Sequence, residues 1–305
     1  MFSTKTGATK LLIGVVIGLI VIKVVVSWLT GSISILAQAT DSLLDLFAAI
    51  ITFSAIRFAV KPADSEHPYG HGKMEDIAGT IQGVLIFIAG GLIIYFSTRR
   101  IIEGSSVELV QSGLVVMLIS IVASVFLSRH LLKVSRATNS VALEANAKNI
   151  TADAYSAVAV VVGLVVVQFT QFYIIDPIIA ICVAIYILKL AVDTMRKPIS
   201  GLLDETLPPP EKMAIEASLI KHSHEIVSYH ELRTRRAGSQ YYIDLHMIMA
   251  KNITLENAHQ ICDQIETEIQ AKFCEASITI HIEPCNYKCE KCSVVCLEYR
   301  SKHRS

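Results

Sequence analysis

The run KLLIGVVIGLIVIKVVVSWL, residues 10–29, decides the fold class, because its only charges in twenty residues are Lys10 at its start and Lys23. A helix needs about 20 residues to cross a hydrocarbon core of about 30 Å. We therefore expect this run to span a membrane. It is too long for a removed signal peptide, and no small-residue cleavage site follows it.

Five further apolar runs of spanning length follow before residue 200. They cover Ile33–Phe58, Asp76–Tyr95, Glu108–Leu132, Asn149–Phe169 and Ile175–Met195. Six spans place both termini on the same side of the membrane. The predicted fold class is therefore an all-α bundle of six transmembrane helices, followed by a soluble part.

Composition agrees with a membrane protein. Of 305 residues, 52% are hydrophobic and 18% charged, and the net charge is zero, whereas a soluble chain carries about a quarter charged residues. A neutral chain gives no support to nucleic-acid binding. Half of the 54 charged residues follow residue 200, so we expect a transmembrane domain over 1–202, a cytoplasmic domain over 203–284 and a cysteine-rich tail over 285–305.

The basic residues predict the orientation. They concentrate in the N-terminal arm, in the loops after spans 2 and 4, and at the end of span 6, with only Arg99 and Arg100 on the opposite side. By the positive-inside rule, both termini and the soluble part are expected in the cytoplasm of a cell-membrane protein. A reducing cytoplasm also suits the seven cysteines, an odd number.

The soluble part shows the pattern of a small α+β domain. Helical runs cover Glu211–His222 and Asn257–Lys272, and strand patterns cover Glu225–Arg235, Gln240–Ala250 and Ser277–Glu283. The order αββαβ predicts a ferredoxin-like sandwich.

Two pairs of polar residues stand out within the predicted spans. Asp41 and Asp45 are four residues apart on span 2, and Asn149 and Asp153 repeat this spacing on span 5, so each pair shares one helix face. An acid within a membrane costs roughly 2.5–3.5 kcal/mol, and a divalent cation between the pairs would offset that cost. Alternatively, these residues frame helix ends near the membrane surface.

The loop DSEHPYGHGKME, residues 64–75, follows span 2. Asp64, His67 and His71 offer a carboxylate and two imidazoles, a set that suits Zn²⁺ or a similar ion. Taken alone, the loop would more readily be an exposed polar turn shaped by proline and glycine.

These features together resemble the cation diffusion facilitator family of divalent-metal transporters. The resemblance rests on HPYGHGK, Asp41-x-x-x-Asp45, the six spans and the αββαβ tail, and covers about residues 8–284. It implies a homodimeric antiporter in a lipid bilayer that exports Zn²⁺, Fe²⁺ or Mn²⁺ against protons, and no enzyme. The same metal ions would be both cargo and regulator.

The resemblance also implies roles for single residues. The transport site would be Asp41, Asp45, Asn149 and Asp153, and the loop site Asp64, His67 and His71. The cytoplasmic ligands would be His230, His246, His259, His281 and Glu283, although any one of these histidines, taken singly, would more readily be a surface or interface residue. Lys73 and Asp204 would form a salt bridge between protomers, or are simply solvated charges.

Asn149 departs from the family pattern, because zinc-transporting relatives have histidine there. An amide oxygen is a harder and weaker ligand than imidazole, which shifts preference towards Mn²⁺ or Fe²⁺ without abolishing zinc binding. Asparagine does not titrate, so exchanged protons must reside on the aspartates.

Cys285, Cys289, Cys292 and Cys296 follow the last predicted strand. Four thiols at this spacing suggest an additional Zn²⁺, Cu⁺ or iron–sulfur site, with free thiols or a redox pair as the alternative.

Two other functional classes remain open. One is a metal sensor or assembly scaffold of the same family with impaired transport. The other, an intramembrane hydrolase with paired aspartates, fits less well because no nucleophile motif accompanies the acids.

Overall fold

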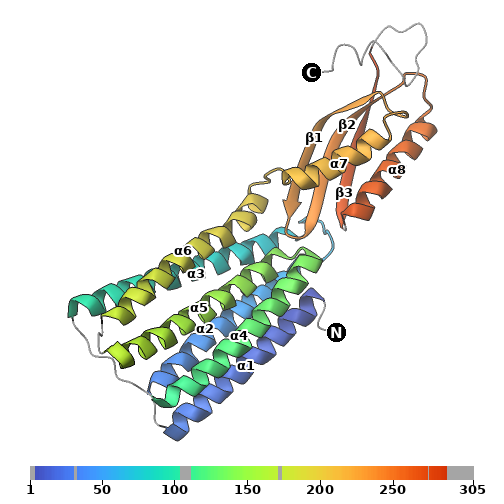
Figure 1. The fold of residues 1–305 in the computed structure, drawn as a ribbon. Helices are drawn as coiled ribbons and strands as arrows, with labels where there is room; N and C mark the ends of the chain where they lie inside the picture. Colours follow the sequence, from blue (N-terminus) through green and yellow to red (C-terminus); the bar gives the residue numbers. More distant parts are fainter. Residues whose placement is uncertain (1–3, 31–32, 104–110, 171–173, 274, 287–305) are drawn as a thin grey trace. The chain divides into compact units, whose positions relative to one another are not determined.

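The computed structural model describes residues 4–30, 33–103, 111–170, 174–273 and 275–286. Side chains are also left undescribed at several helical positions, including Asp41. The chain divides into two compact units, Met1–Leu202 and Leu203–Ser305, which are described separately below (Figure 1).

The first unit is a bundle of long helices. They are α1 (Lys5–Thr30), α2 (Ile33–Ala59), α3 (Lys73–Glu103), α4 (Gln111–Thr138), α5 (Val141–Thr170) and α6 (Ile175–Leu202). Within the described residues, α1, α2, α3, α4 and α6 each contain a stretch long and apolar enough to cross a membrane. The predicted helical membrane bundle is therefore confirmed.

Most helices extend beyond the apolar runs that predicted them. Helix α5 begins at Val141, eight residues before the expected Asn149, and α3 ends at Glu103 instead of Tyr95. An apolar run marks only the hydrocarbon-spanning part, whereas backbone hydrogen bonding continues into polar sequence. Asn149 consequently lies two turns inside α5. The expected start of span 4 at Glu108 lies outside the described residues.

Helices α3 and α6 approach each other closely at two glycines of α3. A Cβ atom at Gly79 would lie 2.8 Å from Cγ of Pro198, and one at Gly83 would collide with Met195. Gly79 and Gly83 form a G-x-x-x-G motif, whose lack of side chains lets two membrane helices pack backbone to backbone.

The remaining helices share an apolar core. Its most buried side chains include Leu12 of α1, Ile56 of α2, Leu131 of α4 and Leu143 of α5. This core holds α2 and α5, which carry the predicted transport ligands.

The carboxylate of Glu75 joins the starts of three helices. Glu75 lies in the first turn of α3, with its side chain 1% exposed, and its Oε1 atom accepts from Nζ of Lys5 at 3.1 Å. Its Oε2 atom accepts from Oγ of Ser140 at 2.7 Å and from the backbone N–H of Val141 at 3.1 Å. Since Val141 is the first residue of α5, Glu75 caps a helix other than its own.

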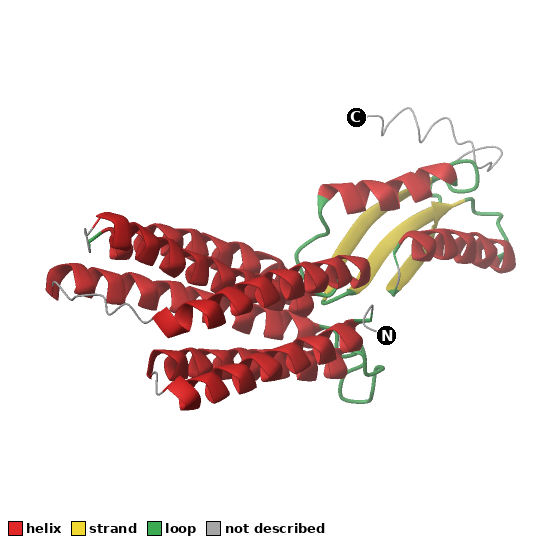
Figure 2. Ribbon diagram, turned by 60° about the horizontal axis from the view of Figure 1, so that its bottom comes forward, coloured by secondary structure: helices red, strands yellow, loops and turns green. Residues whose placement is uncertain are grey.

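The second unit contains α7 (Pro209–Lys221), β1 (Ser228–Ala237), β2 (Gln240–Met249), α8 (Leu255–Lys272) and β3 (Ala276–Pro284). Strand β2 lies between β1, which is antiparallel to it, and β3, which is parallel. The predicted αββαβ order is confirmed. Figure 2 shows the two helices packed on the sheet.

One face of this sheet is apolar and the other is polar. Ile243, Leu245 and Met247 of β2 are buried together with Ile215 of α7 and Ile265 of α8. The alternate residues of β2 point to the opposite face, which both helices leave uncovered. His230, His246 and His281 lie together on that face.

Candidate metal centres

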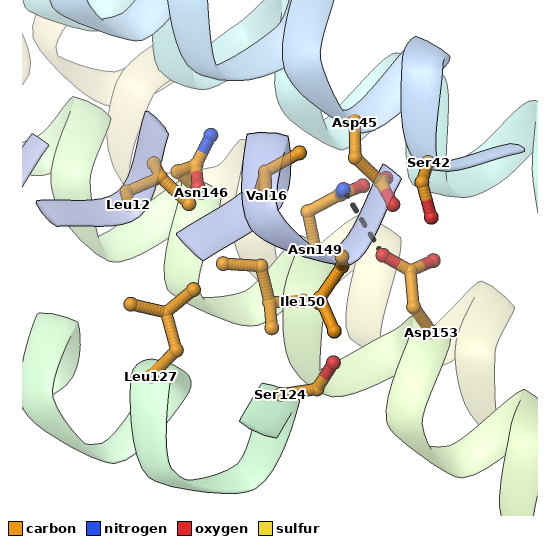
Figure 3. A pocket seen from close by; sticks show the side chains of 11 residues that line it. Leu12, Val16, Ser42, Asp45, Ser124, Leu127, Asn146, Asn149, Ile150 and Asp153 are labelled. Atoms are coloured by element: carbon orange, nitrogen blue, oxygen red, sulfur yellow. Dashed lines mark hydrogen bonds between the residues drawn. The ribbon is translucent and has the colours of Figure 1, made fainter. Parts of the chain in front are cut away.

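A small cavity lies between α2 and α5 in the membrane unit. Its volume is about 30 Å³, and its polar lining includes Ser42 and Asp45 of α2 and Asn149 and Asp153 of α5 (Figure 3). Side chains of α1 and α4, such as Val16 and Leu127, close its apolar side. Oxygen ligands in an apolar wall are suited to hold a dehydrated cation.

Asn149 and Asp153 contact each other as their spacing requires. Nδ2 of Asn149 donates to Oδ2 of Asp153 over 3.4 Å, leaving the amide oxygen as the group with which Asn149 could bind a cation. Asp45 lines the same cavity from α2. Asp41 lies one turn before Asp45, but its side chain is outside the described residues.

A buried lysine reaches the edge of this cavity. Lys23 of α1 is 8% exposed, and its ammonium donates to Oγ of Ser42 over 2.7 Å. Ser42 precedes Asp45 by three residues on the same helix face. The positive charge therefore lies near the part of the cavity that Ser42 and Asp45 line.

Three further polar side chains are buried between α2, α3 and α5. Gln82 and Asn146 both direct an amide N–H at Oγ1 of Thr52, each over 3.2 Å. Asn146 also lines the cavity. It precedes Asn149 by one helical turn, a spacing that could have identified it from the sequence.

The loop between α2 and α3 brings Asp64, His67 and His71 together. Oδ1 of Asp64 lies 3.2 Å from Nδ1 of His67, and Oδ2 lies 3.4 Å from Nε2 of His71. One ligand atom from each of the three residues lies within 4.8 Å of the ligand atoms of the other two. The backbone N–H of His67, donating to Asp64, holds the pKa of Asp64 below its usual value, so the carboxylate stays ionised and can bind a cation.

Lys73 and Asp204, the two residues expected to form a salt bridge between protomers, each contact a residue of the same chain. Nζ of Lys73 donates to the carbonyl of Leu202 at 3.4 Å, and Asp204 pairs with Arg235 at 3.2 Å. A bridge between protomers stays a prediction.

The polar face of the sheet in the second unit carries another cluster. His230, His246 and Glu283 each place a ligand atom within 4.8 Å of the others. Oε1 of Glu283 lies 2.9 Å from Nδ1 of His246, and Oε2 lies 3.6 Å from Nε2 of His230. His281 is adjacent, with its ring 4.8 Å from that of His246.

His259 lies apart from this cluster. It is on α8, where its Nε2 atom lies 3.6 Å from Asp263 and its side chain is 73% exposed. That His259 is a ligand of the predicted metal site therefore stays a prediction. For this to hold, His259 would have to reach the cluster of a second protomer.

Glu231 joins the cluster on the sheet, although the sequence did not suggest it. The pairing of β1 with β2 is irregular between His230 and Arg233, and Glu231 has a left-handed φ of 50°. Its carboxylate consequently lies 3.8 Å from Nε2 of His246. A hydrogen bond from Arg233 and the nearby His246 lower the pKa of Glu231.

Cys285 is the one tail cysteine within the described residues. It is 2% exposed, and its backbone N–H donates to the carbonyl of Met249 at 2.8 Å. Cys289, Cys292 and Cys296 lie outside the described residues, so a tail metal site stays a prediction.

Comparison with known proteins identifies similar chains over nearly the whole length. The family model for the cation efflux transmembrane domain matches residues 10–203, and that for the cation efflux protein cytoplasmic domain matches residues 207–285. A cation-efflux pump FieF of Shewanella oneidensis is 34% identical over 277 residues, covering 91% of this chain and 93% of the relative. An uncharacterized transporter of Synechocystis is 32% identical over 256 residues, or 84% and 83% of the two chains.

Among solved structures, the zinc form of a putative zinc transporter CzrB is 33% identical. It matches 28% of this chain and 98% of its own, with a TM-score of 0.26.

Proposed function

The chain belongs to the cation efflux family, also called the cation diffusion facilitator family, and from this premise we propose that it exports a divalent metal ion of the Zn²⁺, Fe²⁺ or Mn²⁺ type in exchange for protons. The observation that carries the proposal is the cavity between α2 and α5, lined by Asp45, Asn149 and Asp153. Asp41 would complete the site from α2. Both termini would lie in the cytoplasm.

In this proposal, the carboxylates alternate between metal and protons. A cation entering from the cytoplasm binds the aspartates and the amide oxygen of Asn149. The helices then rock to open the cavity outward, and the cation leaves as protons bind the carboxylates. Because Asn149 does not titrate, every exchanged proton resides on an aspartate.

Asn149 would set the relative preference among metals. With carboxylates and an amide oxygen as ligands, the site is harder than one containing imidazole. It should therefore bind Mn²⁺ and Fe²⁺ better, relative to Zn²⁺, than a histidine-containing site does.

The cytoplasmic domain would act as a metal sensor in a homodimer. The face that carries His230, His246 and Glu283 is not covered by α7 or α8. A second protomer on this face could bring its own ligands, including His259, to the cluster. Metal binding would then favour the conformation in which this site is complete.

The test is metal uptake into inverted vesicles under a set pH gradient, with Zn²⁺, Mn²⁺, Fe²⁺ and Co²⁺ in competition. We expect pH-dependent flux that is lost in Asp45→Ala and retained in Asn149→Ala. If none of the four metals gives pH-dependent flux, the chain is instead a sensor or scaffold with impaired transport.

A further inference from the structure

The polar group formed by Thr52, Gln82 and Asn146 is nearly inaccessible to solvent. Thr52 and Gln82 are 0% exposed, and Asn146 is 2% exposed. The three residues come from α2, α3 and α5, and Asn146 is the member that lines the cavity (Figure 3). Buried polar groups of this kind are normally fully hydrogen-bonded.

Both amide nitrogens of this group donate hydrogen bonds. Nε2 of Gln82 donates to the carbonyl of Ala48 at 2.9 Å and to Oγ1 of Thr52 at 3.2 Å. Nδ2 of Asn146 donates to the same Thr52 oxygen at 3.2 Å. The two amide nitrogens thus converge on one hydroxyl oxygen.

The two amide oxygens of this group lack hydrogen bonds. Oε1 of Gln82 and Oδ1 of Asn146 are buried and make no hydrogen bond within the described part of the chain. A buried acceptor without a partner is costly. A ligand that such an oxygen can bind must carry a positive charge or a polar hydrogen.

Asn146 differs from Gln82 because it lines the transport cavity. Asn146, Asn149 and Asp153 follow one another at spacings of three and four residues, so they form one stripe along α5. All three line the cavity, with Asp45 contributed by α2. Asn146 therefore belongs to the same wall as the proposed ligands, and its buried, unpartnered oxygen is the group that it could offer to a cation there.

We propose that Oδ1 of Asn146 is a further ligand for the transported divalent cation, held in position by Thr52 and Gln82. This inference rests on the proposed transport function. Because Asn146 is one turn closer to the start of α5, it would bind the cation on the cytoplasmic side of Asn149. A neutral amide oxygen is a hard ligand, so its contribution should be larger for Mn²⁺ than for Zn²⁺.

The test compares Asn146→Leu and Asn146→Asp with the wild-type full chain, by titration calorimetry with Mn²⁺ and with Zn²⁺. Leucine has nearly the shape of asparagine but no oxygen, so we expect a rise of at least about tenfold in the dissociation constant for Mn²⁺ and a smaller rise for Zn²⁺. Aspartate restores an oxygen, so its Mn²⁺ affinity should equal or exceed that of the wild type.

Thermal unfolding separates ligation from a structural role. Without metal, Asn146→Leu should unfold within a few degrees of the wild type, because it removes an unsatisfied acceptor together with one hydrogen bond. Its stabilisation by added Mn²⁺ should be clearly smaller. Ser128→Ala is the matched control: it removes a buried hydrogen bond to the carbonyl of Ala147 outside the cavity, and should leave metal affinity unchanged.

Two results would overturn the inference. Unchanged Mn²⁺ affinity in Asn146→Leu would mean that the oxygen binds only a resident water. Equal losses in the leucine and aspartate variants would mean a structural role. Asp45→Ala shows whether the proposed transport site itself is wrong. If metal binding does not change in Asp45→Ala, the transport site is contradicted, and not only the role of Asn146.

Discussion

Replacing Glu75 should destabilise the membrane unit far more than replacing another paired acid on the same helix. Glu75 accepts hydrogen bonds from Lys5, Ser140 and Val141. Glu103, at the other end of α3, pairs with Arg99 at 2.6 Å, but these side chains are 50% and 57% exposed. The two acids therefore differ in burial and in the number of donors.

The magnitude follows from what Glu75→Ala leaves behind. Two donors at the start of α5 lose a charged acceptor, at about 1.5–3 kcal/mol each. The ammonium of Lys5 loses its counter-charge, but it is 15% exposed and can turn towards solvent, so it adds little. We expect a loss of about 3–5 kcal/mol, the range for breaking a buried ion pair. Glu103→Ala should cost about 0.3–0.5 kcal/mol, as for exposed i,i+4 pairs.

Denaturant unfolding of the full chain in detergent would measure both losses. Hydrogen exchange adds a local readout, because the first amides of α5 should exchange faster in Glu75→Ala and at the wild-type rate in Glu103→Ala. If the two variants unfold within about 1 kcal/mol of each other, Glu75 does not cap α5 in the folded protein.

Three further predictions concern the cation sites and the pH dependence of folding. Asn149→His should raise the ratio of Zn²⁺ to Mn²⁺ transport in proteoliposomes, because imidazole is the softer ligand; equal ratios in the two forms would contradict this. Lys23→Met should tighten metal binding by at least about tenfold, because a buried positive charge near the acids repels a divalent cation. Lys189→Met, on the exposed face of α6, should leave the affinity unchanged, and an equal change in both variants would refute the idea. The hydrogen bond from Lys221 lowers the pKa of Glu268 below 4.5, so its stabilisation should be complete above pH 4.5 and disappear as the pH falls through the lower folded-state value. Glu268→Gln should therefore lose stability relative to the wild type at neutral pH but not in strong acid, as thermal unfolding across this range would measure.

The sequence predicted the type and order of the elements because these depend on local periodicity. Apolar runs of spanning length marked the membrane helices, and alternating residues marked β2. Helix starts were less predictable. Helix α5 begins where Ser140 and Glu75 provide acceptors, and Glu75 is 65 residues away in sequence from Ser140.

Contacts between candidate ligands were predictable where the ligands share a helix, and less predictable elsewhere. The spacing of Asn149 and Asp153 implies their contact, which the structure gives as 3.4 Å. Glu231 could not be predicted, because strict alternation along β1 would place it on the face opposite His230. Only the irregular pairing and the left-handed φ bring its carboxylate to His246.

The size of the cavity has a consequence for the rate at which different ions could pass. At about 30 Å³, it has room for about two water-sized spheres, so an ion carrying its full hydration shell does not fit. An ion must shed most of its water before reaching Asp45 and Asp153. Mg²⁺ dehydrates reluctantly and usually keeps several waters in proteins. The narrow space would therefore reject an abundant cellular cation kinetically, at the dehydration step, whatever its affinity for carboxylates.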